Sequence, residues 1–237
     1  MRFFATALAA GLFVAALSPA PAHAHDSINA EARKNYLSRL QEMHASLTAS
    51  SPPGVRARSL YQIAVTLDEI RELFNQDIIS HGIVKGLETS LLLNELGRTG
   101  DKLDASPKTG LYLSHLQKYR DAIRLDPKAS YIEHARYMLL KSHFYDSFSD
   151  NPLTPFSQTK EELNEMIALG EGLLKSKQPS VSGEEVRFIL GIHYLQAISQ
   201  QVMNKEEGLK KVRKLAQELH KDYPQSLKLL TLESLMQ

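Results

Sequence analysis

The chain has 237 residues, with 28 Lys and Arg against 27 Asp and Glu, and it contains no cysteine. A net charge this close to zero gives no electrostatic footprint for nucleic acid or anionic lipid. The absence of cysteine excludes disulfides, thiolate metal sites, thiol catalysis and a lipoprotein anchor.

The first 24 residues have the layout of a secretory signal peptide. Arg2 precedes an apolar run over residues 3–17, and Ala22-His23-Ala24 places small residues where a signal peptidase reads. The run is shorter than the roughly 20 apolar residues that span a bilayer. We expect cleavage after Ala24, or alternatively after Ala22. The mature protein is then periplasmic or secreted and has no membrane span.

Hydrophobic periodicity predicts an all-α protein, because no segment shows the sustained alternation of a strand. Between residues 55 and 77 the apolar stripe consists of Leu60, Ile63, Leu67, Ile70 and Phe74. The charged residues Asp68, Glu69, Arg71 and Glu72 lie mostly elsewhere on the helix. Thr159 with Glu162, and Ser182 with Glu185, have the spacing of capping boxes. The predicted helices are 27–49, 54–77, 80–97, 108–125, 130–147, 158–176, 183–203, 206–222 and 225–236.

The second half of the chain contains positions with the spacing of a tetratricopeptide repeat. They comprise a Tyr-x-x-Ala-x-x-x-x-Pro pattern, a Leu-Gly-x-x-Tyr pattern and the small residue and proline of a later helix. The matching residues are Tyr119, Ala122, Pro127, Leu190, Gly191, Tyr194, Ala216 and Pro224. Small residues at such positions allow neighbouring helices to approach closely, so Gly191 is expected at a helix–helix contact.

The stretch DPKASYIEHARYMLLKSHF, which begins at Asp126, and DYPQS at 222–226 resemble periplasmic tetratricopeptide proteins. The helical lipoprotein of the outer-membrane β-barrel assembly machinery is one of these. The resemblance covers about residues 119–230 and implies antiparallel helix pairs stacked as a short α-solenoid, a fold that binds protein partners. The prolines at 127, 179 and 224 do not follow the 34-residue period, and no cysteine is available for lipidation. Only the architecture is therefore carried over.

The sequence predicts three parts and no enzyme. They are a signal peptide at 1–24, an N-terminal helical portion at 25–106 and repeats at 107–237. Neither a Gly-x-Ser-x-Gly elbow nor a phosphate-binding glycine loop occurs, and no cofactor is implied. The acidic pairs at 161–162, 184–185 and 206–207 fall in predicted first helical turns, where they complement the helix dipole. A helical enzyme with an unrecognised site is one alternative.

Histidine spacing points to metal only at the new N-terminus. No His-x-x-x-His pair occurs, and His193 lies in an apolar stripe, where a hydrogen-bonded core residue is expected. Cleavage after Ala22 leaves His23-Ala24-His25, which suits square-planar copper or nickel, and cleavage after Ala24 leaves His25 first. A periplasmic metal-handling protein is therefore the other alternative.

A long connection is predicted between two helices at residues 147–156. Its apolar side chains, Phe148, Leu153 and Phe156, either pack back between the flanking helices or contact a partner. Together these features predict an exported protein that binds a protein or peptide partner, in an adaptor or assembly role.

Overall fold

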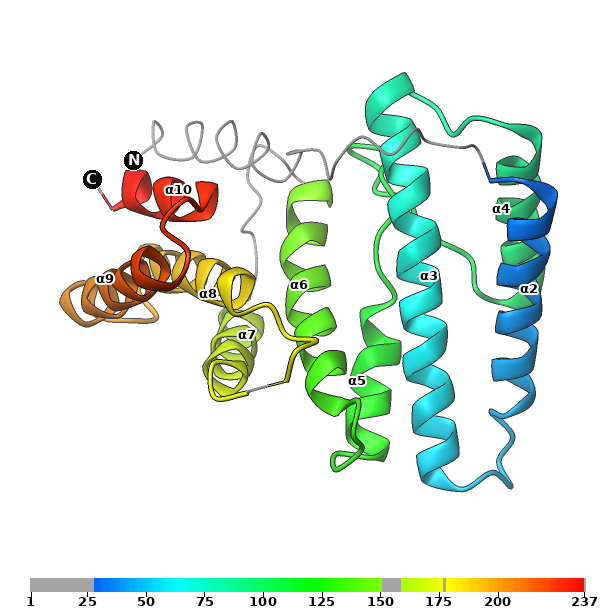
Figure 1. Cartoon of the computed structure of the whole chain (residues 1–237), viewed down its shortest axis with the longest axis horizontal. Helices are drawn as coiled ribbons and strands as arrows, with labels where there is room; N and C mark the ends of the chain where they lie inside the picture. Colours follow the sequence, from blue (N-terminus) through cyan, green and yellow to red (C-terminus); the bar gives the residue numbers. More distant parts are fainter. Residues whose placement is uncertain (1–27, 151–158, 177, 237) are drawn as a thin grey trace. The chain divides into compact units, whose positions relative to one another are not determined.

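The computed structural model describes residues 28–150, 159–176 and 178–236. Within these ranges the protein is all-α, as predicted, with nine helices and no strand (Figure 1). An isolated bridge between Ala105 and Tyr112 is the β-type pairing found there. The helices are α2 (Ala30–Ala45), α3 (Pro53–His81), α4 (Leu87–Thr99), α5 (Leu116–Leu125), α6 (Ile132–Asp150), α7 (Lys160–Leu173), α8 (Gly183–Ser199), α9 (Lys205–Asp222) and α10 (Leu227–Leu235).

Helix N-termini follow the predicted caps. At α7 the Thr159 side chain accepts from the backbone N–H of Glu162, and the Glu162 carboxylate accepts from the Thr159 N–H, which completes the capping box. At α8 the Ser182 hydroxyl accepts from the N–H of Glu185 across 3.3 Å, but the Glu185 carboxylate accepts from Tyr145. Only the serine half of the second box is therefore used as a cap.

Two predicted helices begin later than expected. The helix predicted from residue 80 begins at Leu87, because Gly82, with φ of +77°, ends α3 in the left-handed region. The helix predicted from residue 108 begins at Leu116, because Gly110 has φ of +73° and turns the chain. Residues 101–115 thus form an irregular connection.

The chain divides into two compact units at a point inside α6. The N-terminal unit contains the described residues up to Ser142, and the C-terminal unit contains those from His143 onward. This division differs from the predicted boundary between residues 106 and 107. The repeat-like residues from Tyr119 to Pro127 therefore belong to the first unit.

The N-terminal unit is built around an apolar core on α3. Its buried members are Leu40, Ile63, Leu67, Ile70, Phe74, Leu92, Leu96 and Leu103. The stripe predicted from periodicity supplies four of them. Leu40 comes from α2, Leu92 and Leu96 come from α4, and Leu103 lies in the connection after α4. Burying these side chains is the main favourable term in holding the three helices together.

In the C-terminal unit, α7, α9 and α10 pack around the buried helix α8 (Figure 1). Phe144 and Phe188 meet edge to face with ring centroids 5.9 Å apart. At the contact with α10, a Cβ built on Gly191 would lie 2.8 Å from a methyl group of Leu232. The expectation that Gly191 occupies a close helix–helix contact is confirmed.

The other repeat-like positions divide by residue type. The apolar ones are buried, and the prolines follow α5 and α9 on the surface. Buried are Tyr119, Ala122, Leu190, Tyr194 and Ala216, whereas Pro127 and Pro224 are exposed. No helix in the described ranges combines the length and hydropathy needed to cross a bilayer.

Candidate partner-binding groove

Two adjoining hollows lie on the surface of the N-terminal unit, on either side of Tyr61. The first, of about 220 Å³, is formed by α2 and α3. The second, of about 450 Å³, is formed by the N-terminal part of α3 and the connection between α5 and α6. Tyr61 and Gln62 line both hollows, and we refer to the two together as the Tyr61 groove. Its full lining is Arg39, Glu42, Met43, Gly54, Arg58, Tyr61, Gln62, Val65, Asp126, Ala129, Ser130 and Tyr131.

Tyr61 is held in place from two directions. Its ring stacks on that of Tyr131, with centroids 4.7 Å apart and planes 15° apart. Its hydroxyl shares a 2.6 Å hydrogen bond with Nδ1 of His134, on the first turn of α6. Burial raises the pKa of Tyr61 and lowers the pKa of His134, so both groups are neutral near pH 7. The half-buried Tyr61 ring is therefore a fixed, uncharged part of the groove.

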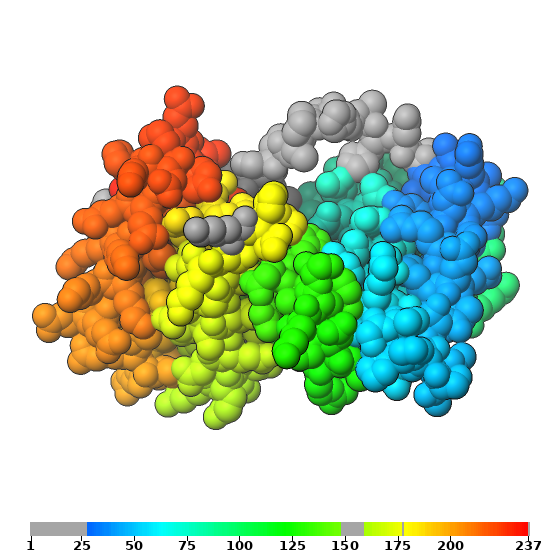
Figure 2. Space-filling model, turned by 60° about the horizontal axis from the view of Figure 1, so that its bottom comes forward, coloured from blue at the N-terminus to red at the C-terminus, as the bar shows by residue number. Residues whose placement is uncertain are grey.

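The end of the groove at the start of α3 is polar. A Cβ on Gly54 would lie 3.2 Å from Oδ2 of Asp126, so the glycine lets this carboxylate approach the N-terminus of α3. Negative charge is favourable there because the helix dipole is positive at that end. Arg58 is exposed on the same wall. Figure 2 brings forward the end of the molecule where the cyan start of α3 adjoins the green α5–α6 segment.

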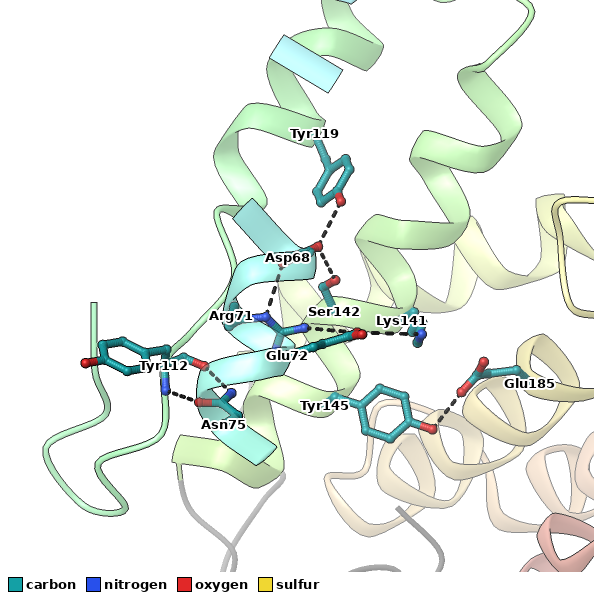
Figure 3. Close-up of polar contacts among 10 residues, drawn as sticks. All are labelled: Asp68, Arg71, Glu72, Asn75, Tyr112, Tyr119, Lys141, Ser142, Tyr145 and Glu185. Atoms are coloured by element: carbon teal, nitrogen blue, oxygen red, sulfur yellow. Dashed lines mark hydrogen bonds and ion pairs between the residues drawn. The ribbon is translucent and has the colours of Figure 1, made fainter. Parts of the chain in front are cut away.

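A buried polar cluster holds the helices that form the groove (Figure 3). Oδ2 of Asp68 accepts hydrogen bonds from the Tyr119 hydroxyl at 2.8 Å and the Ser142 hydroxyl at 3.0 Å. Oδ1 of the same carboxylate lies 3.2 Å from Nε of Arg71. Asp68 thus joins α3 to α5 and α6, two turns along α3 from Tyr61.

The surroundings of Asp68 are closed to water. Asp68 and Ser142 are each 2% exposed, Tyr119 is fully buried and Arg71 is 6% exposed. Burial first, and Asp68 second, raise the pKa of Tyr119. A substrate has no access to these groups, so they order the helices and do not form a catalytic site.

Asp68 and Arg71 lie off the apolar stripe, yet both are buried. The two side chains form an ion pair, and buried charges are usually paired in this way. At the edge of the cluster, Glu72 lies 3.7 Å from Arg71 and 3.9 Å from Lys141 (Figure 3). Because Glu72 is exposed to water, these two outer ion pairs contribute little to the stability of the fold.

The irregular connection at residues 101–115 is fixed by side chains rather than by a helix. Asn75 on α3 donates to the carbonyl of Tyr112 at 2.9 Å and accepts from its N–H at 2.7 Å, as a backbone strand would (Figure 3). The fully buried carboxylate of Asp101 contacts both His44 on α2 and Lys118 on α5. These contacts tie α2, α3 and α5 into one unit and so maintain the walls of the Tyr61 groove.

The partner-contact residues predicted from sequence lie largely outside the described part of the chain. Leu153 and Phe156 are outside it, and of Phe148 only the backbone, in α6, is described. The connection expected at 147–156 begins later than predicted, because α6 continues to Asp150. Whether these three residues contact a partner stays a prediction.

The histidines occupy different environments. His193 is fully buried and its Nδ1 shares a 2.7 Å hydrogen bond with Gln196, as expected of a core residue. His23 and His25 lie outside the described residues. In the described ranges, no group of three or more His, Asp or Glu side chains is arranged to hold a metal ion.

Sequence reasoning missed the Tyr61 groove, although a signal was available. Tyr61 is a large aromatic residue on the face of its helix opposite the apolar stripe, and Tyr131 lies inside the resemblance-bearing stretch. An aromatic residue on a polar helix face is a common feature of binding surfaces. The missing information was that these two tyrosines, 70 positions apart, stack on each other.

Comparisons of this chain with protein-family models, with curated proteins and with solved structures gave no match.

Proposed function

We propose that this is an exported helical protein that binds a protein or peptide segment, in an adaptor or assembly role, through the Tyr61 groove. The observation that carries the proposal is the position of Tyr61, which lines both hollows and is fixed by Tyr131 and His134. A rigid tyrosine gives a partner a large contact area at little entropic cost.

The chemistry of the groove suits a polypeptide. Tyrosine rings offer apolar contact, and Gln62 supplies an amide that can donate to or accept from a peptide backbone. Arg39, Arg58, Glu42 and Asp126 provide charges of both signs. Small-molecule sites are usually enclosed and mainly apolar, whereas this groove is open and mixed in polarity.

The helix pairing supports the same proposal. The repeat-like residues Tyr119, Leu190 and Tyr194 are buried, and Gly191 makes a close helix contact, as in stacked helix pairs. If the helices form the short α-solenoid that the resemblance implies, open surfaces lined by helices would bind extended partner segments. The signal-peptide layout of residues 1–24 supports export.

Capture experiments with Tyr61→Ser test the proposal. Tagged, processed protein incubated with periplasmic extract should capture a defined partner, and the Tyr61→Ser variant should lose most of it. The matched control is Tyr223→Ser, which removes an exposed tyrosine from the C-terminal unit. Loss of the partner in both variants, or in neither, would contradict a role for the groove.

A further inference from the structure

The larger hollow of the Tyr61 groove contains a pair of stacked aromatic side chains. The rings of Tyr61 and Tyr131 lie 15° from parallel, and both residues line this hollow. The Tyr61 hydroxyl shares a 2.6 Å hydrogen bond with His134, which fixes the orientation of its ring. Both tyrosines are half-buried, so part of each side chain faces the hollow. Aromatic-lined grooves of this kind bind peptide segments in the polyproline II conformation.

Two other modes of peptide recognition fit the groove less well. The addition of a partner strand needs the edge of a sheet, and the described part of the chain contains no strand. An amphipathic helix needs a hydrophobic groove. The aliphatic side chains of this lining that are longer than alanine are those of Met43 and Val65, and most of the other lining residues are polar. The groove therefore lacks the apolar surface that a helix would cover.

The charges of the lining cancel within each hollow. Arg39 and Glu42 line the smaller hollow, and Arg58 and Asp126 line the larger one. Arg39 is also paired with Glu69 at 3.3 Å. Neither hollow therefore presents the cluster of arginines that a phosphorylated or acidic motif needs. Charge complementarity favours a segment that carries no net charge.

The polar groups of the groove suit a backbone that presents only carbonyls. Gln62, Ser130 and Arg58 are exposed or half-buried, and each carries N–H or O–H donors. Proline has no N–H, and a polyproline II helix has no internal hydrogen bonds, so its carbonyls are free to accept. On α3 the lining runs from Gly54 to Val65, about 16 Å along the helix axis. That length accommodates about five residues of polyproline II helix.

We propose that the Tyr61 groove binds an uncharged, proline-rich segment of its partner in the polyproline II conformation. This inference rests on the proposed function, because it names the chemistry of the segment bound at the same site. Proline rings pack against Tyr61 and Tyr131, and the segment's carbonyls accept from Gln62 and Ser130. A segment that already has this conformation loses little conformational entropy when it binds.

Synthetic decaproline is the probe that tests this inference. Fluorescein-labelled decaproline made from L-proline is titrated with the protein and followed by fluorescence anisotropy. The matched control peptide is decaproline made from D-proline, which has the same composition and forms the mirror-image helix. The L peptide should bind, and the D peptide should bind much more weakly.

Two protein variants locate the binding site. Tyr61→Ser should weaken the binding of the L peptide about tenfold or more, as expected for a central aromatic contact. Tyr223→Ser, which removes an exposed tyrosine from the C-terminal unit, should leave binding unchanged. Circular dichroism first establishes that both variants are as helical as the wild type.

A second measurement uses the wild-type protein and so does not depend on how Tyr61→Ser folds. The L peptide should shift the amide resonances of Gln62 and Ser130 in a ¹H–¹⁵N spectrum and leave that of Leu230 on α10 unchanged. Equal binding of the two enantiomers, or shifts that leave out the groove, overturns the inference.

Failure of this inference is distinguishable from failure of the proposed function. If a captured partner depends on Tyr61 but L-decaproline neither binds nor displaces it, the inference is overturned and the proposed function stands. If L-decaproline binds the groove but no partner is captured through Tyr61, the proposed function is overturned and the preference of the groove for proline stands.

Discussion

The hydroxyl of Tyr119 donates a hydrogen bond to Oδ2 of Asp68 across 2.8 Å, which joins α5 to α3 where both side chains are shielded from water. Ser142 on α6 donates to the same oxygen, and Arg71 balances its charge. One carboxylate therefore connects three helices of the unit that carries the Tyr61 groove.

Removing parts of this connection should destabilise the fold in a definite order. Tyr119→Phe removes one hydrogen bond to a charged acceptor and should cost about 1.5–3 kcal/mol of unfolding free energy. Asp68→Ala removes the buried carboxylate that pairs with Arg71 and accepts from both hydroxyls, and it should cost more, about 3–5 kcal/mol. Urea denaturation measures both. The exposed Tyr223→Phe serves as a control, and equal effects from Tyr223→Phe and Tyr119→Phe would refute the buried hydrogen bond.

Gly191 should tolerate no large side chain. Gly191→Leu overlaps with Leu232 of α10 and should destabilise the protein by about 1–3 kcal/mol. The control is Gly172→Leu on α7, where a Cβ meets no atom within 4 Å and where leucine has the better helix propensity. The denaturant concentration at the midpoint of unfolding is measured for both variants and compared with that of the wild type. If Gly191→Leu unfolds no earlier than Gly172→Leu, the contact between α8 and α10 is not as described.

Acidification should destabilise the C-terminal unit through His193. Burial lowers the pKa of His193 from 6.5 to about 4, so the unfolded chain binds this proton more tightly than the folded one. The stability associated with neutral His193 is complete above pH 6.5 and declines as the pH falls toward 4. The slope approaches about 1.4 kcal/mol per pH unit and the loss is on the order of 3 kcal/mol in total.

His193→Gln keeps a side chain that can hydrogen bond to Gln196 but cannot titrate. The unfolding free energy of this variant should fall less than that of the wild type between pH 7 and pH 4.5. His115 and His134, whose pKa values are also lowered, remain in both proteins, so the difference isolates His193. If the unfolding free energies of the two proteins fall in parallel as the pH is lowered, His193 does not contribute to the pH dependence of stability.

The segment after α6 offers a separate test of partner contact. If Phe148 and Phe156 face a partner, the double substitution Phe148→Ser with Phe156→Ser should leave thermal stability nearly unchanged and reduce partner capture. If they pack locally, the same variant should lose the few kcal/mol that buried aromatic residues contribute. Thermal denaturation and capture are measured on the same preparation. A stable variant that captures as well as wild type would exclude partner contact by both phenylalanines.

The helices could be predicted from the sequence because their signals are local. Periodicity identified the stripe from Ile63 to Phe74, and Thr159 with Glu162 marked the start of α7. The irregular stretch before α5 could not be predicted in the same way. Its course depends on Asn75, which binds Tyr112 from a helix 37 positions earlier in the chain.

The groove and the buried cluster depend on contacts that have no sequence period. Asp68 is buried because its partners Tyr119 and Ser142, 51 and 74 positions away, are brought to it by the fold. In a single sequence a charged residue on a helix is expected to face water. Likewise, Tyr61 becomes part of a fixed surface only when Tyr131 stacks against it.

Site-specific photo-crosslinking tests the central claim, the Tyr61 groove, most directly. Benzoylphenylalanine is introduced in place of Gln62, which lines both hollows, and separately in place of Gln76, an exposed glutamine on the same helix outside the groove. After irradiation in the exporting cell, the probe at residue 62 should give a discrete crosslinked product that Tyr61→Ser abolishes, and the probe at 76 should give none. Equal products from both positions, or a product at 62 that persists in Tyr61→Ser, would contradict the groove as the binding surface.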